Sequence, residues 1–170
     1  MLEIGFYLLL NAFRVYIMYR FSKLFFKEES QKKWLPYAYI AFCMANSAGY
    51  LLLNNDMVNL IVNIGGLLFI ILFGYIGNIK RKLLLAVAGY GMNLLTEDMA
   101  WVIFVKGRSE QMMEFGFFFS VFLFFLLEIF LEKCFDFHKK ADIPLYKNLL
   151  LILISVGSMF ISVTLVEGFY

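Results

Sequence analysis

Charged residues are scarce in this chain, and that scarcity limits what the protein can be. Only 16% of the 170 residues are charged, whereas 62% are hydrophobic. A water-soluble domain is roughly 45–50% apolar and about 25% charged. The chain therefore has too little polar surface for a soluble globule, and a disordered chain is excluded for the same reason. The formal net charge of +2 also excludes a nucleic-acid binder of the basic-groove type, so no nucleic-acid partner is expected.

Residues that carry catalysis or bind metals are equally few. The chain has two cysteines, Cys43 and Cys134, and one histidine, His138. Two cysteines give no disulfide framework, and we interpret both as free thiols. Cys134 and His138 lie in a basic loop without a third orienting group, so they predict neither a thiol nucleophile nor a metal site. The sequence also lacks a phosphate-binding glycine loop, G-x-S-x-G and H-E-x-x-H. We predict no enzyme, no catalytic residue, no metal and no cofactor.

Long apolar segments are abundant instead. A helix needs about 20 mostly apolar residues to cross the hydrocarbon of a bilayer. Six segments meet this length, and aromatic residues, 19% of the chain, fall near several of their ends, as in the aromatic belts of membrane proteins. The segments are residues 4–25, 35–53, 57–75, 83–105, 115–131 and 149–166. We predict an all-α integral membrane protein, with residues 1–170 forming a single transmembrane domain of six helices.

Basic residues are distributed unevenly between the connections, and this sets the orientation of the predicted bundle. Twelve flank the first, third and fifth connections, whereas the fourth has only Lys106 and Arg108 and the second has none. The twelve are Arg20, Lys23, Lys27, Lys32, Lys33, Lys80, Arg81, Lys82, Lys133, Lys139, Lys140 and Lys147. Short loops rich in lysine and arginine stay in the cytoplasm. The odd-numbered connections are therefore predicted to be cytoplasmic, and both termini to lie outside.

Polar residues inside the predicted crossings are the candidate ligand-binding or switch residues, because such groups are costly in hydrocarbon. They are Asn11, Arg14, Asn46, Asn59, Asn63, Asn93, Glu97 and Asp98. Helical spacing places them in stripes on four helices, at similar depth in the outer leaflet. We expect a cluster open to the outside, in which Arg14 pairs with Glu97 or Asp98, since an unpaired buried charge is unfavourable. The alternative for the asparagines is interhelical hydrogen bonding alone.

Two further patterns concern packing. Small residues recur at Ala41, Ala45 and Gly49 of the second segment, and at Gly65, Gly66, Gly74 and Gly77 on or just after the third. Such spacing lets membrane helices approach closely, so we predict that these positions are packing faces. Glu128 and Glu132 lie one turn apart near the inner end of the fifth segment. We expect both to reach the cytoplasmic interface and to meet Lys133 or Lys147.

Two stretches carry a resemblance to a known family. Residues 8–21 (LLLNAFRVYIMYRF) and 93–99 (NLLTEDM) resemble the membrane sensor of bacterial histidine kinases of the accessory-gene-regulator type, which attach a GHKL-type ATPase domain. The resemblance implies a quorum-sensing receptor in a bacterial plasma membrane, in which the membrane helices receive an extracellular signal, often a secreted peptide. It also implies signal-binding or switch roles for the polar residues of the predicted cluster. The chain departs from the family in having no phosphoacceptor helix and no ATP-binding domain.

Several alternatives remain open at this stage. The chain is interpreted either as the sensor part of a longer two-component kinase or as a stand-alone relative. A second function class, a substrate-binding membrane subunit or small-molecule transporter component, fits an outward polar cluster equally well. A structural membrane protein that assembles with something else is a third. The expected partners are membrane lipid, an extracellular peptide signal, and a second copy or another membrane protein.

Overall fold

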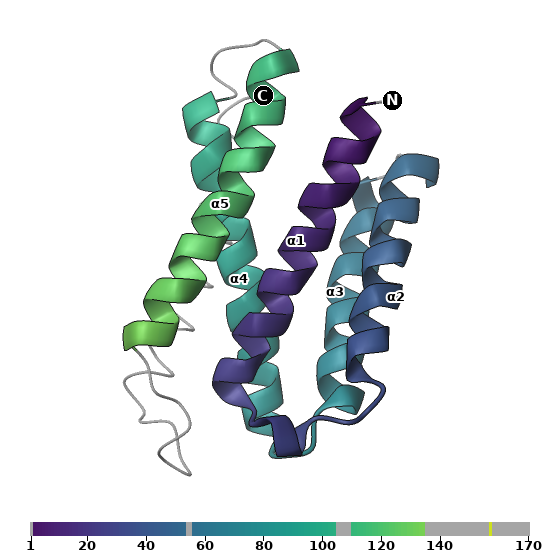
Figure 1. Ribbon diagram of the computed structural model, residues 1–170, viewed down its shortest axis with the longest axis vertical. Helices are drawn as coiled ribbons and strands as arrows, with labels where there is room; N and C mark the ends of the chain where they lie inside the picture. Colours follow the sequence, from purple (N-terminus) through teal and green to yellow (C-terminus); the bar gives the residue numbers. More distant parts are fainter. Residues whose placement is uncertain (1, 54–55, 105–109, 135–156, 158–170) are drawn as a thin grey trace. The chain divides into compact units, whose positions relative to one another are not determined.

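The computed structural model describes residues 2–53, 56–104, 110–134 and 157, which form helices joined by short connections (Figure 1). The helices are α1 (Leu2–Phe25), α2 (Leu35–Ala48), α3 (Asp56–Gly74), α4 (Ile79–Phe104) and α5 (Glu110–Cys134). A 3₁₀ turn, Glu28–Ser30, follows α1, and a π-helical turn, Gly49–Leu53, continues α2. The all-helical class is confirmed for these ranges. The predicted crossing at residues 149–166 lies outside them, apart from Gly157.

Only one helix of the described ranges is both long and apolar enough to cross a membrane. It is the Phe115–Lys133 part of α5, and a shorter apolar stretch, Ile61–Gly74, lies in α3. The other described helices miss one of these two criteria: α2 and the apolar part of α3 are shorter, whereas α1 and α4 carry more charged residues. Arg14 and Arg20 lie within α1, and α4 holds both a basic first turn and the Glu97–Asp98 pair. The coarse expectation of a helical protein with a membrane-spanning candidate therefore stands, and the six-helix count stays a prediction.

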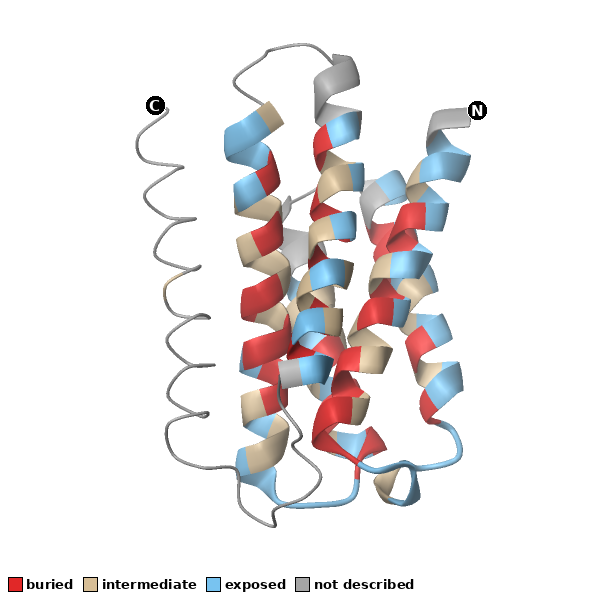
Figure 2. Ribbon diagram, turned by 60° about the vertical axis from the view of Figure 1, so that its left-hand side comes forward, coloured by how far each residue is buried: buried red, intermediate tan, exposed pale blue. Residues whose placement is uncertain are grey.

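The chain divides into two compact units, Met1–Ala86 and Val87–Tyr170. In the first unit α2 packs against both α1 and α3. Its largest fully buried side chains include Ile17, Phe21 and Phe25 of α1, Leu35 of α2, Ile71 of α3, and Tyr75. Buried and exposed residues alternate around the axis of each helix, so one side of each helix packs and the other is exposed (Figure 2).

Glycines set how closely α2 and α3 approach. A Cβ atom added at Gly66 of α3 would lie 2.7 Å from the ring of Phe42 on α2, and one added at Gly74 would overlap the side chain of Leu35. Both glycines were predicted to pack, and they do. The same prediction is wrong for Ala41 and Ala45, which are exposed on α2, and for Gly65, where nothing lies within 4 Å of an added Cβ. The spacing of small residues identifies positions that can pack closely, but it does not show which of them face a neighbouring helix.

In the second unit α4 and α5 meet at another glycine. A Cβ atom at Gly116 of α5 would lie 3.3 Å from Cβ of Phe104 on α4. The rings of Phe104 and Phe119 add an edge-to-face contact with centroids 5.2 Å apart. Glu128 of α5 is only 1% exposed, whereas Glu132 is exposed. The prediction that Glu128 reaches the interface is therefore wrong, because Glu128 lies on the side of α5 that also carries the buried Phe124 and Leu131.

Candidate functional site

Two of the predicted site residues, Asn11 of α1 and Asn46 of α2, contact each other. Nδ2 of Asn46 donates to Oδ1 of Asn11 at 3.3 Å, and Nδ2 of Asn11 donates to Oγ of Ser47 at 2.7 Å. Nδ2 of Asn11 also lies 3.4 Å from the backbone oxygen of Cys43 and 4.0 Å from its Sγ. We name these four residues the α1–α2 polar contact. It joins α1 to α2 through both the oxygen and the nitrogen of the Asn11 side-chain amide.

The helical register of α2 explains why these residues meet. Asn46 and Ser47 follow Cys43 by three and four residues, which places both beside Cys43 on one side of the helix. Asn11 is 2% exposed, and Asn46 and Ser47 are also buried. Immediately after them the helix changes to the π-helical turn Gly49–Leu53, which contacts α3. Such π-turns occur often at functional sites, because they redirect the side chains that follow.

A second polar group lies on α4, within the second unit. Nδ2 of Asn93 donates to Oε1 of Glu97 at 3.3 Å, and Oγ1 of Thr96 donates to the backbone oxygen of Asn93 at 2.9 Å. Oδ1 of Asn93 is buried and has no hydrogen-bond donor among the described residues. Buried polar atoms in native proteins nearly always have a partner. This oxygen therefore keeps the capacity to accept a further hydrogen bond.

The other predicted site residues lie on three different helices. Arg14, Asn63 and Asp98 are half-buried on α1, α3 and α4, whereas the side chain of Asn59 lies outside the described residues. Arg14 follows Asn11 by one turn of α1. The ion pair predicted between Arg14 and Glu97 or Asp98 would join the two units, and it stays a prediction. The ligand-binding role of all eight residues also stays a prediction.

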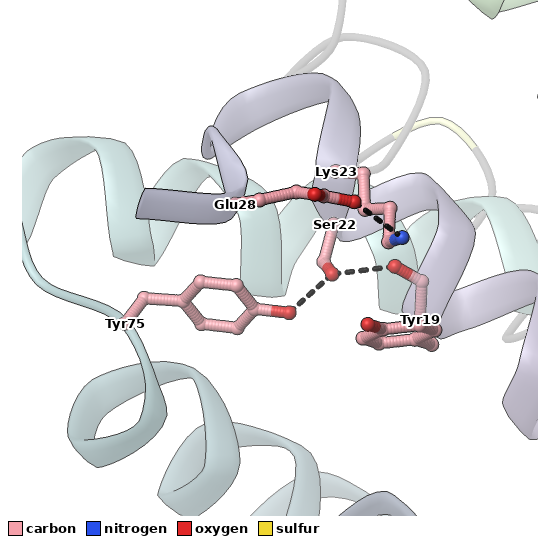
Figure 3. A network of polar contacts seen from close by, with 5 residues as sticks. All are labelled: Tyr19, Ser22, Lys23, Glu28 and Tyr75. Atoms are coloured by element: carbon pink, nitrogen blue, oxygen red, sulfur yellow. Dashed lines mark hydrogen bonds and ion pairs between the residues drawn. The ribbon is translucent and has the colours of Figure 1, made fainter. Parts of the chain in front are cut away.

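A hydroxyl cluster that the sequence did not predict lies at the other end of the first unit. The hydroxyl groups of Ser22 and Tyr75 are hydrogen-bonded, and Oγ of Ser22 also donates to the backbone oxygen of Tyr19 at 2.6 Å (Figure 3). The hydroxyl of Tyr39 lies 3.3 Å from that of Tyr75, and the Tyr39 ring meets the Tyr19 ring edge-on. The cluster joins α1, α2 and the chain after α3. Aromatic residues at segment ends were interpreted as belt residues, which hid this buried role for Tyr75.

The described residues contain no group of three or more histidine, cysteine, aspartate or glutamate side chains that could hold a metal ion. The polar groups that they do contain are amides, hydroxyls and single carboxylates. Such groups bind through hydrogen bonds, which can be replaced by hydrogen bonds to a competing donor or acceptor. Comparisons with protein-family models, with curated proteins and with solved structures find no match to this chain.

Proposed function

We propose that this chain is a signal-receiving membrane domain, a bundle of six crossings like the sensor of quorum-sensing histidine kinases. Its polar side chains within the helices would receive an extracellular ligand. The membrane part is supported by helix length, since α1, α4 and α5 have 24, 26 and 25 residues. About 20 are enough to cross the hydrocarbon.

The exposed face of α5 also supports a lipid environment. Large apolar side chains recur along it every three or four residues, from Phe115 at 66% exposure to Phe130 at 58%. Phe118, Phe122 and Leu126 lie between them on the same side. A continuous apolar stripe of this kind is unfavourable in water and indicates contact with lipid or with another protein. In a bilayer the same stripe needs no further cover.

One observation carries the receptor part of the proposal, which is the buried Oδ1 of Asn93. It has no donor among the described residues, and its own amide is hydrogen-bonded to Glu97 one turn away. A ligand that donates to Oδ1 would therefore act on a side chain already coupled to a carboxylate. A peptide supplies such donors through its backbone N–H groups.

The α1–α2 polar contact supplies an element that a signal can shift. A ligand changes a protein's conformation only if it binds one arrangement better than another. The hydrogen bond between Asn11 and Asn46 is long enough, at 3.3 Å, to be exchanged for one to a ligand. Loss of this hydrogen bond would allow α2 to move relative to α1, next to the π-helical turn. Movement of that helix is the output we propose.

The test is a chimaera in which this chain, followed by one added crossing, replaces the sensor of a cytoplasmic histidine-kinase reporter. We expect conditioned medium from the source bacterium to change reporter phosphorylation, and protease treatment of the medium to abolish the change. The same kinase fused to an unrelated membrane anchor is the control. A chimaera that ignores the medium, together with a small molecule that co-purifies with the chain, would instead favour the substrate-binding subunit.

A further inference from the structure

We propose that the first and third connections together bind the phosphate headgroups of anionic phospholipids. We call residues 26–34 and 75–82, with the exposed lysines Lys27, Lys32, Lys33 and Lys80, the basic platform. The inference rests on the membrane-spanning part of the proposed function and is independent of signal reception. Its ligand is a lipid phosphate diester at the surface of the bilayer.

The platform is one fixed piece of structure. The backbone N–H of Ile76 donates to the oxygen of Ser30 at 2.7 Å, and that of Lys32 donates to the oxygen of Gly74 at 3.0 Å. These bonds flank an antiparallel bridge between Gln31 and Tyr75. Below the bridge the buried ring of Tyr75 lies 4.8 Å from that of Phe26, centroid to centroid. Lysines that are distant in sequence are therefore held on a common surface.

Basic side chains outnumber acidic ones in the platform. Residues 26–34 and 75–82 contain six basic and two acidic side chains. One of the two acidic groups, Glu28, lies 3.2 Å from Nζ of Lys23 on α1, and Nζ of Lys82 donates to the backbone oxygen of Leu72 at 2.7 Å. Among the described residues, the ammonium groups of Lys32, Lys33 and Lys80 have no ion-pair partner. Clustered charge of one sign attracts ligands of the other sign.

Exposed apolar side chains beside these lysines identify the ligand as lipid. Ile76 and Ile79 are 60% and 54% exposed, and Tyr37, one turn into α2, is 73% exposed. Trp34 is also exposed at the end of the first connection. Aromatic and apolar groups next to lysines suit the boundary between headgroups and acyl chains. A free phosphate ion or an acidic soluble protein would neutralise the lysines but would leave these four side chains in water.

Trp34 provides a local reporter for the experiment. The chain has two tryptophans, so Trp101→Phe leaves Trp34 as the only one. The full chain is reconstituted in nanodiscs of phosphatidylcholine with a minority of phosphatidylglycerol, one of the two lipids being brominated. We expect brominated phosphatidylglycerol to quench Trp34 well beyond its share of the bilayer. Each lysine at an anionic surface contributes about 1 kcal/mol, or about fivefold in binding. Lys32→Gln, Lys33→Gln and Lys80→Gln together should therefore lower the preference at least about fivefold.

Matched variants distinguish the outcomes. Arginine at the same three positions should keep the preference, and Lys106→Gln with Arg108→Gln, which changes another connection, should leave it unaltered. Soluble glycerol phosphate should not compete. Equal quenching by the two lipids, an unchanged glutamine variant, or displacement by glycerol phosphate would overturn the lipid site. Absence of quenching by either brominated lipid would instead contradict the membrane-spanning proposal.

Discussion

Asn11 and Asn46 tie α1 to α2 through a hydrogen bond of 3.3 Å, and Asn11 uses its other amide atom to hold Ser47 at 2.7 Å. One buried side chain thus acts as acceptor and donor to the same neighbouring helix. An amide suits this position because its carbonyl oxygen can accept one hydrogen bond while its NH₂ group donates another.

The Asn11–Ser47 bond gives the first prediction. Asn11→Ala, Ser47→Ala and the double variant form a double-mutant cycle, and we expect a coupling of about 0.6 kcal/mol, at most about 1.7 kcal/mol. The measurement is reversible unfolding in detergent micelles. Strictly additive losses in the double variant would mean that the 2.7 Å contact does not contribute to stability.

Two adjacent glycines give a matched pair. Gly66→Ala should destabilise the protein by about 1–3 kcal/mol, because the new Cβ would meet the Phe42 ring at 2.7 Å. Gly65→Ala adds the same methyl group to the same helix where nothing lies within 4 Å. It should be neutral or stabilising by up to about 1 kcal/mol, since alanine favours helix more than glycine does. Thermal unfolding of both variants tests this, and equal effects would contradict the close packing of α2 on α3.

The hydroxyl of Tyr75 gives a third prediction. Tyr75→Phe keeps the ring but removes the partner of Ser22 and Tyr39. Ser22 keeps its bond to the backbone oxygen of Tyr19, but the buried hydroxyl of Tyr39 loses its partner. Such a loss costs about 1–3 kcal/mol, so the variant should unfold at correspondingly lower denaturant. Tyr37→Phe, at an exposed position of α2, is the control and should match the parent. A Tyr75→Phe protein as stable as the control would show that the cluster is dispensable.

The orientation of the chain is testable by labelling single cysteines. In a Cys43→Ser, Cys134→Ser background, Asn55→Cys should react with a membrane-impermeant maleimide on intact cells. Asn78→Cys, beside the basic Lys80–Lys82 run, should react only after the cells are opened. Labelling in the reverse pattern would invert the predicted topology.

The sequence predicted the five described helices because long apolar runs define them without reference to tertiary contacts. It also placed Asn11 and Asn46 at similar depth, since helical rise fixes depth. It did not predict Ser47 as their partner or the Ser22–Tyr75 bond, because a hydroxyl in an apolar run leaves no periodic signal. The π-helical turn at Gly49 was missed for a similar reason: one extra residue in a turn does not change hydropathy. The burial of Glu128 was not predicted, because it depends on which side of α5 packs against the rest of the protein.

The most direct test of the receptor proposal is the dose–response of the kinase chimaera with Asn93→Ala or Glu97→Gln. Both changes alter the hydrogen-bonded pair on α4, and Glu132→Gln, an exposed carboxylate on α5, is the control. Loss of a buried hydrogen bond to a ligand costs about 1–3 kcal/mol, which is about 5- to 150-fold in affinity. We predict that the signal concentration giving half-maximal response rises by that factor in Asn93→Ala, with membrane insertion unchanged. It should rise less in Glu97→Gln, because the glutamine oxygen can still accept from Nδ2 of Asn93. A half-maximal concentration equal to that of the control in both variants would contradict the account.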